Sequence, residues 1–226
     1  AGFSVTAMAG YSQGADSEAF AAMAAAIGMV ALLIVGPGIS TYLVERRTTT
    51  ESENRIAHIA MHDALTNLAN RHQFTEALRN ECNALGDGGT PFALLMVDLD
   101  DFKDVNDTHG HDAGDDVLRE FARRLRDNVR GMDLACRYGG EEFVIVMPDT
   151  PPHIAAEVAE RLRAQIESDD FSIENGARTI EVTVSVGVTS LIQSENETAK
   201  ALLKRADEAL YEAKQTGRNR VVSRAA

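Results

Sequence analysis

The chain has 226 residues, of which 44% are hydrophobic, and it carries a formal net charge of -13 at pH 7. This length suits one domain with an appendage. The acidic balance argues against nucleic acid or an anionic membrane surface as a partner, because either would repel the chain. The two cysteines, Cys82 and Cys136, show neither metal-ligand spacing nor a disulfide framework, which suits a reducing compartment.

The N-terminal part divides into three segments. Residues 1–18 are small, polar and weakly acidic, and we expect an extracytoplasmic or loop segment there. Residues 19–44 contain no charged side chain, and this run is long enough to cross a bilayer as a helix. Arg46 and Arg47 are the first basic residues and directly follow it, which by the positive-inside rule directs the rest of the chain to the cytoplasm. A polar juxtamembrane linker helix is expected over residues 45–61.

Two other interpretations of the apolar run remain open at this point. It could be a buried, alanine-rich core helix, or the apolar part of a cleaved signal peptide. A signal peptide carries its basic residues before the apolar run, whereas here they follow it. The membrane span is therefore the favoured prediction, with the C-terminal part in the cytoplasm at the inner membrane of a bacterium.

Residues 62–226 alternate between helical and strand patterns and form the main domain. Helices are predicted over residues 71–85, about 115–130, 152–168 and 198–215. Strands are predicted over residues 92–97, 179–188 and 220–222. Together with an internal hairpin, this alternation predicts an α/β fold in which helices pack on a mixed sheet.

The hairpin lies in residues 137–143, which read Arg-Tyr-Gly-Gly-Glu-Glu-Phe between two apolar runs. A Gly-Gly pair between strand-prone runs is a strong hairpin signal. Because Gly139 and Gly140 have no side chains, a large anionic ligand can approach the backbone of the turn closely. Taken alone, the hairpin could equally be an ordinary surface turn.

Carboxylates stand at the ends of two predicted strands. Asp98 ends the buried run, and the hairpin delivers Glu141 and Glu142 to what could be the neighbouring strand end. Carboxylates from adjacent strands hold Mg²⁺ (or Mn²⁺), with phosphate oxygens as further ligands. Successive residues of a regular strand point to opposite faces, so Glu141 and Glu142 can both reach one metal ion only if the turn is irregular. Glu141 is the expected main ligand. The pattern predicts phosphoryl transfer, with a solvated strand end as the alternative.

The stretch 101–115 is too polar to belong to a core, and we expect a loop there that leads into the next helix. A carboxylate such as Asp115 can accept hydrogen bonds from N1–H and the 2-amine of guanine, which adenine lacks. Asn106 can add a contact to the base edge, and Lys103 suits a phosphate. Each of these residues, taken alone, is more often a helix cap or an ordinary polar loop residue.

Four motifs resemble those of the diguanylate cyclase (GGDEF) family. They are D-x-L-T-x-L-x-N-R at 63–71, F-K-x-x-N-D-x-x-G-H-x-x-G-D at 102–115, R-Y-G-G-E-E-F at 137–143 and L-Y-x-x-K-x-x-G-R-N at 210–219. The resemblance covers about residues 60–226 and implies a palm-like sheet flanked by helices. Asn67 stands where the family usually has Gly, and we expect it to keep a left-handed turn. Residues 4–9 loosely resemble the end of an MHYT-type membrane sensor region.

The resemblance implies a role for each matching position. Metal ligands are implied at Asp98, the Leu99 carbonyl, Glu141 and Glu142, with Glu141 also the candidate base. Substrate contacts are implied at Lys103, Asn106, His111, Asp115, Gly139, Gly140, Lys214 and Arg218. An inhibitory product site is implied at Arg130, Asp133 and Arg161, where arginine grips phosphate or stacks on guanine and the carboxylate reads the guanine edge.

The reaction implied by the family joins two GTP molecules into cyclic di-GMP and releases two pyrophosphates. One domain carries one GTP, so two domains must face each other as a homodimer. A degenerate GGDEF-like receptor that binds GTP or cyclic di-GMP without turnover is the alternative from another class. A cyclase for another nucleotide is a third interpretation, and it depends on whether Asn106 and Asp115 recognise guanine.

Overall fold

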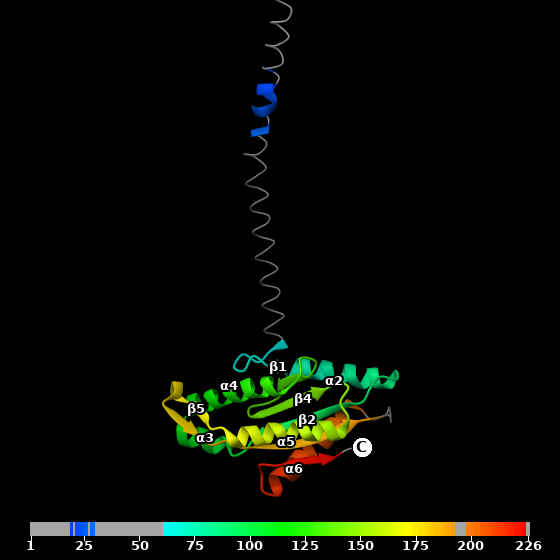
Figure 1. The fold of residues 1–226 in the computed structure, drawn as a ribbon, viewed down its shortest axis with the longest axis vertical. Helices are drawn as coiled ribbons and strands as arrows, with labels where there is room; N and C mark the ends of the chain where they lie inside the picture. The colour runs from blue at the N-terminus through cyan, green and yellow to red at the C-terminus, as the bar shows by residue number, and fades with distance from the viewer. Residues whose placement is uncertain (1–18, 20, 27, 30–60, 193–197, 225–226) are drawn as a thin grey trace, which may run out of the picture. The chain divides into compact units, whose positions relative to one another are not determined.

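The structure is a computed structural model, and it describes residues 19, 21–26, 28–29, 61–192 and 198–224 (Figure 1). The chain divides into two compact units, Ala1–Ile56 and Ala57–Ala226. In the first unit the described residues are helical and exposed. The predicted segment 1–18, most of the predicted span 19–44 and nearly all of the predicted linker 45–61 lie outside the described residues. Within the part of the chain that the structure describes, no helix is both long and apolar enough to cross a membrane.

The second unit is built on a six-stranded mixed sheet. Its strands, from one edge to the other, are β1 (Ala69–Asn70), β3 (Leu134–Arg137), β4 (Glu142–Met147), β2 (Phe92–Leu99), β7 (Val184–Leu191) and β8 (Val221–Arg224). The central strand β2 is antiparallel to both of its neighbours, β4 and β7, whereas the pairs β1–β3 and β7–β8 are parallel. The predicted mixed sheet is confirmed.

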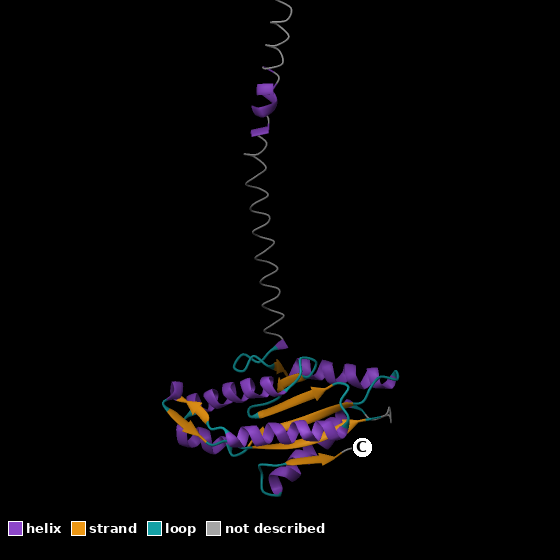
Figure 2. Cartoon of the chain, viewed as in Figure 1, coloured by secondary structure: helices purple, strands orange, loops and turns teal. Residues whose placement is uncertain are grey.

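The helices in the described part of the second unit cover this sheet, either directly or, for one of them, by packing on another helix (Figure 2). They are α2 (Arg71–Gly86), α3 (Phe102–His109), α4 (His111–Asn128), α5 (Pro152–Ser168) and α6 (Ala199–Gln215). A two-stranded hairpin, β5 (Phe171–Ile173) and β6 (Arg178–Ile180), with a 3₁₀ turn at Glu174–Gly176, separates α5 from β7. The helices predicted over 71–85, 152–168 and 198–215 are confirmed with small shifts at their ends.

The core has two layers because β2 is buried on both faces. Leu95 and Val97 pack with α4 and α5 on one face, and Leu94 and Met96 pack with α2 and α6 on the other. A strand that is covered on both sides has no polar positions to alternate with apolar ones, so its sequence is a continuous apolar run. This is why the run 92–97 was recognisable as a buried central strand.

The predicted loop at 101–115 is wrong in part, because most of this stretch is helical. α3 occupies Phe102–His109, and α4 begins at His111 rather than near residue 115. Gly110, with a φ of 86°, separates the two helices. Their polar residues lie mostly on exposed faces, which gave the stretch the composition of a loop. The strand predicted over 179–188 is divided in the structure. Residues 178–180 form β6, residues 181–183 belong to no strand, and β7 begins at Val184.

Candidate active site

Two adjacent strand ends bring the predicted metal ligands together. Asp98 lies directly opposite Glu142 in the β2–β4 ladder, so the two side chains share a face of the sheet. Glu141 precedes β4 in the turn, and its carbonyl accepts a hydrogen bond from the Leu99 N–H at 3.3 Å. The turn therefore brings both glutamates to the end of β2, where Asp98 and the Leu99 backbone lie.

Asp98 is a buried carboxylate in an acidic neighbourhood. It is 3% exposed, and the Lys214 ammonium donates a hydrogen bond to its Oδ1 at 2.8 Å. Burial raises the pKa of Asp98 to about 6, and although Lys214 lowers this pKa, the nearby charges of Glu141 and Glu142 raise it further. The site thus holds more negative charge than one lysine balances, which is the electrostatic environment of a cation site.

The donor set fits a hard divalent cation. Within the described residues, no group of three or more His, Cys, Asp or Glu side chains is arranged to hold a metal by itself. The predicted set instead mixes carboxylates, Asp98 and Glu141 above all, with the Leu99 carbonyl. Mg²⁺ prefers such oxygen donors and is usually bound by one or two carboxylates together with substrate phosphates and water. A site completed by a triphosphate is therefore chemically consistent with these residues.

The glycine turn is held in place by Arg137. Its guanidinium donates to the Gly140 carbonyl at 2.7 Å from Nη2 and 3.1 Å from Nε, and to Asp63 Oδ1 at 3.1 Å. Burial raises the pKa of Asp63, but hydrogen bonds from Thr66 and Arg137 outweigh it and leave this pKa below its ordinary value. Asn67 closes the Asp63 turn with a φ of 54°, as predicted for a left-handed position. The motif at 63–71 thus supports the turn at 139–140.

The residues predicted to recognise guanine lie on α3 and α4. Asn106 is half-buried, and a Cβ at Gly114 would collide with its Oδ1 atom, so only glycine leaves room for this amide. Asp115, the next residue along α4, is half-buried, with its Oδ2 3.6 Å from an Arg119 nitrogen. The structure therefore brings Asn106 to the first turns of α4. Lys103 and His111 are exposed at the starts of α3 and α4.

Replacing Gly114 with Ala is expected to displace Asn106 and weaken the binding of a non-reactive GTP analogue about tenfold, the loss from one good hydrogen bond at a buried edge. Titration calorimetry with the purified chain measures this. Asn106→Ala should weaken binding to a similar extent, and the double variant should bind no worse than either single one, because both changes remove the same contact. Unchanged binding by Gly114→Ala would contradict this role for Asn106.

The two predicted phosphate-binding cations meet the end of β2. Lys214 lies in the last turn of α6 and pairs with Asp98, and Arg218 follows three residues after the helix ends. The Arg218 Nε lies 3.2 Å from Asp101 Oδ1. Both cations therefore reach acidic residues that flank the buried strand end, one on each side of Leu99.

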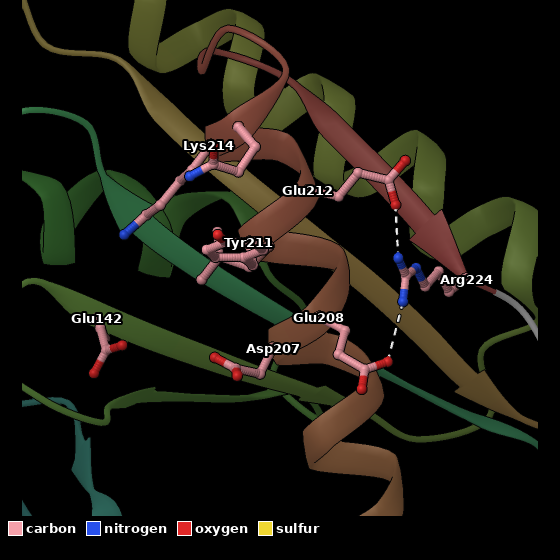
Figure 3. Close-up of a pocket in the computed structure, with 9 residues that line it drawn as sticks. Glu142, Asp207, Glu208, Tyr211, Glu212, Lys214 and Arg224 are labelled. Atoms are coloured by element: carbon pink, nitrogen blue, oxygen red, sulfur yellow. Dashed lines mark hydrogen bonds and ion pairs between the residues drawn. The ribbon is translucent and has the colours of Figure 1, made fainter.

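A pocket of about 640 Å³ opens beside Lys214 along α6 (Figure 3). Glu142 of β4 and α6 residues, Asp207 and Tyr211 among them, line it, and Tyr211 is 64% exposed. At its far side, Arg224 of β8 pairs with two glutamates of α6. The acidic edge of the active site is thus open to solvent on the α6 side.

Two of the three predicted inhibitory residues, Arg130 and Asp133, line a separate pocket of about 410 Å³. The Arg130 N–H donates to Asp133 Oδ2 at 2.8 Å, and Asp133 Oδ1 is buried without a hydrogen-bond partner. The lining of this pocket does not include Arg161, whose Nη2 donates to the Asn128 carbonyl at 3.1 Å. The structure therefore joins Arg130 to Asp133, whereas Arg161 contacts the chain at Asn128, two residues before Arg130.

Two site residues had no distinct role in the sequence interpretation. Asp100 is a buried acceptor directly after β2, and Asn219, the residue after Arg218, donates its N–H to Asp100. Asn219 ends the motif at 210–219, whereas Asp100 lies two residues before the motif at 102–115, and no motif indicates that the two meet. An acidic residue directly after a buried strand is the signal that could have drawn attention to Asp100.

A family comparison agrees with this geometry. The family model described as "Diguanylate cyclase, GGDEF domain" matches residues 60–220. The chain belongs to the diguanylate cyclase GGDEF-domain family. The match spans both glutamates of the turn, the α3–α4 pair and the closing motif, so this GGDEF domain keeps all the elements from which the site was built.

Known relatives agree with the assignment. Response regulator PleD of Caulobacter vibrioides is 47% identical to this GGDEF-domain chain over 191 residues, covering 83% of the chain and 42% of PleD. Diguanylate cyclase A of Treponema denticola is 40% identical over 173 residues, covering 75% of this chain and 46% of that protein. This chain thus spans less than half the length of these two curated relatives.

A solved structure gives the same fold. The coiled coil and GGDEF domain of DgcB from Caulobacter crescentus, in complex with c-di-GMP, superposes with a TM-score of 0.77 at 34% sequence identity. The likeness covers 85% of this chain and 100% of that chain. The palm-like fold implied by the motifs is confirmed for this GGDEF domain.

Proposed function

We propose that this chain is a diguanylate cyclase that condenses two GTP molecules into cyclic di-GMP. The observation that carries the proposal is the buried Asp98, which lies opposite Glu142 beside a Gly-Gly turn and is charge-paired with Lys214. Family membership supports it. So does the name of a relative at 40% identity, diguanylate cyclase A.

In the proposed reaction, the 3′-hydroxyl of each GTP attacks the α-phosphorus of the other. Two phosphorus–oxygen bonds form, two bonds to pyrophosphate break, and each hydroxyl loses its proton. Glu141 is the proposed base for that proton. One domain binds one GTP, so a two-fold homodimer is proposed, in which the paired sites hold the two nucleotides in line.

Mg²⁺ or Mn²⁺ is the proposed cofactor, held by Asp98, the Leu99 carbonyl and Glu141, with Glu142 beside them. When bound, such a cation neutralises charge on the phosphates and makes a nearby hydroxyl easier to deprotonate. Lys214, which pairs with Asp98 in the structure, would bind the terminal phosphates of the nucleotide.

The remaining substrate contacts are proposed from the placement of α3 and α4. Asn106 and Asp115 recognise the guanine edge, with His111 beside them, and the backbone at Gly139 and Gly140 lies close to the nucleotide. Lys103 and Arg218 bind phosphates. Asp115 is acceptor-only when ionised, so it pairs with the two donors of guanine and is repelled by the unprotonated N1 of adenine.

Nucleotide selectivity tests the substrate. The chain, incubated with Mg²⁺ and one nucleotide at a time, is expected to release pyrophosphate from GTP and to release at least about 100-fold less from ATP, as a mismatched base edge leaves buried polar groups unpaired. Pyrophosphate and cyclic di-GMP should appear in a 2:1 ratio. Equal turnover of ATP and GTP would contradict guanine recognition by Asn106 and Asp115.

Product inhibition through Arg130 and Asp133 is proposed as the control of this activity. The buried, unpartnered Oδ1 of Asp133 supports it, because a buried acceptor without a donor is costly and a guanine N–H would satisfy it. Arg130 binds phosphate or stacks on guanine, and Arg161 is the proposed second arginine.

Arg130→Ala is therefore expected to raise the cyclic di-GMP concentration that halves the rate by at least about tenfold, since a charged hydrogen bond is worth about 1.5–3 kcal/mol. The initial rate without product should stay unchanged. Arg123→Ala changes an exposed arginine on α4 that does not line this pocket, so it serves as the control and should be inhibited like the original chain. Equal inhibition of both variants would argue against the site.

A membrane tether through residues 19–44 is proposed from the uncharged run and the two arginines that follow it. The catalytic domain is then in the cytoplasm at the bacterial inner membrane. Deleting residues 19–44 should move the protein from the membrane fraction of lysed cells to the supernatant. A full-length chain already in the supernatant would contradict the tether.

A further inference from the structure

Asp100 ties three segments of the chain together at the end of β2. It is 7% exposed, and its carboxylate accepts hydrogen bonds from Thr183 Oγ1 at 2.8 Å, Ser185 Oγ at 2.7 Å and the Asn219 N–H at 3.0 Å. Its own N–H donates to the Thr183 carbonyl at 2.9 Å. The carboxylate is therefore satisfied within the protein, and one of its oxygens holds the backbone of the segment that follows α6.

The Asn219 side chain holds the same segment from the opposite direction. Its Oδ1 accepts from Arg163 Nη1 at 2.7 Å, and its Nδ2 donates to Glu167 Oε1 at 2.6 Å. Arg163 and Glu167 are one helical turn apart on α5 and pair with each other at 2.7 Å. Asn219 is thus fixed at its backbone by the sheet and at its side chain by a helix.

The anchored segment has a backbone that needs such support. Gly217, Arg218 and Asn219 have φ values of 122°, 58° and 44°, three consecutive residues in the left-handed region. Non-glycine residues are sparsely populated there and keep this conformation only where their surroundings enforce it. Arg218, in the middle, is half-exposed, and its guanidinium pairs with Asp101.

We propose that Asp100 and Asn219 are positioning residues that hold Arg218 in place for the terminal phosphates of the nucleotide. The inference rests on the proposed function, in which Arg218 binds those phosphates. Neither residue touches substrate in this account. They act by fixing the backbone on which Arg218 stands, so that less conformational freedom is lost when the triphosphate binds.

The test compares two ligands that differ in their phosphates. α,β-Methylene-GTP carries the terminal phosphates and does not react, whereas GMP lacks them. Asn219→Gly removes the side-chain amide that contacts Arg163 and Glu167, and glycine adopts the left-handed backbone conformation at this position without strain. We expect it to raise the dissociation constant of the analogue about tenfold, as for the loss of one charge-assisted interaction, and to leave that of GMP within about twofold.

A matched pair of substitutions on α5 separates the contact with Asn219 from general effects on the helix. Glu160 and Glu167 both pair with Arg163, at 2.7 Å each, but Glu167 alone of the two also accepts from Asn219. Glu167→Ala should therefore weaken binding of the analogue, while Glu160→Ala should not. Glu167→Gln, which keeps an oxygen acceptor for the Asn219 amide, should restore most of the affinity.

A double-variant cycle tests whether Asn219 acts through Arg218. If it does, adding Asn219→Gly to Arg218→Ala should cause no further loss of analogue affinity. Additive losses in that cycle, equal losses for the analogue and GMP, or unchanged binding by Asn219→Gly would each overturn the inference while leaving the proposed function intact. If the original chain binds the analogue no better than GMP, the proposed phosphate site fails, and the inference fails with it.

Discussion

Asp98→Asn is expected to abolish turnover and, at neutral pH, to stabilise the chain. The pKa of Asp98 in the folded protein is about 6, above its ordinary value near 4. Between these values the folded state binds more protons than the unfolded state, so stability falls as pH rises through this window. Above pH 6 the ionised carboxylate opposes folding, and the uncharged amide of Asn removes that cost.

The expected gain in the free energy of unfolding is on the order of 1–3 kcal/mol at pH 8, from about two pKa units at 1.36 kcal/mol each, and it should vanish near pH 4. Urea unfolding at both pH values measures it. Asp127→Asn, an exposed aspartate on α4, is the control and should change little. If Asp98→Asn is less stable than the original chain at pH 8, the ionised Asp98 carboxylate does not oppose folding.

The same change is expected to lower the rate of cyclic di-GMP formation at least about 100-fold, because even outer-shell partners of a bound metal are worth 10- to 100-fold. A gain of stability together with a loss of activity would show that the Asp98 carboxylate lowers the stability of the fold and is needed for turnover. A variant that keeps more than about a tenth of the rate would exclude Asp98 as a principal metal ligand.

Gly187→Ala is expected to destabilise the chain by about 3 kcal/mol, near the upper end for overpacked sites. Gly187 pairs with Met96 in the sheet, and α6 packs directly on it. An added Cβ would collide with the Ala206 carbonyl and with the backbone of Leu210. All of these atoms belong to the backbone of α6, so the clash is relieved only if the helix as a whole moves away from β7.

Urea unfolding measures this loss, with Gly131→Ala as the control. A Cβ at Gly131 would meet no atom within 4 Å, so little change in stability is expected there. Because α6 carries Lys214 and leads to Arg218, Gly187→Ala should also weaken binding of the GTP analogue. A small effect, below about 1 kcal/mol, would mean that α6 can shift away from β7 at little cost.

Periodicity in the sequence was sufficient where one physical constraint controlled the pattern. The run 92–97 is apolar throughout because helices cover both faces of β2, and the long helices follow their apolar stripes. α3 was missed because most of its side chains are exposed and Gly110 interrupts the pattern. The hairpin at 171–180 was missed because its strands have three residues each, too few for a period to emerge.

The candidate site divides in the same way. Local patterns predicted Asp98 and Glu141 at strand ends and as metal ligands, whereas the phosphate-binding roles of Lys214 and Arg218 came from the family resemblance. The pairing of Lys214 with Asp98 and of Asn219 with Asp100 joins residues more than a hundred positions apart, which no local pattern predicts. These contacts come from tertiary packing of α6 and its following turn on the sheet.

The most direct test of the account is to incubate the purified chain with Mg²⁺ and GTP, beside a Glu141→Ala variant, and to identify the nucleotides by chromatography and mass. Protein concentration is raised in steps so that two domains can meet. The account predicts cyclic di-GMP from the original chain, at a rate per domain that rises with concentration, and none above background from Glu141→Ala. Tight binding of GTP by a dimer that forms no product would contradict it and make the chain a receptor.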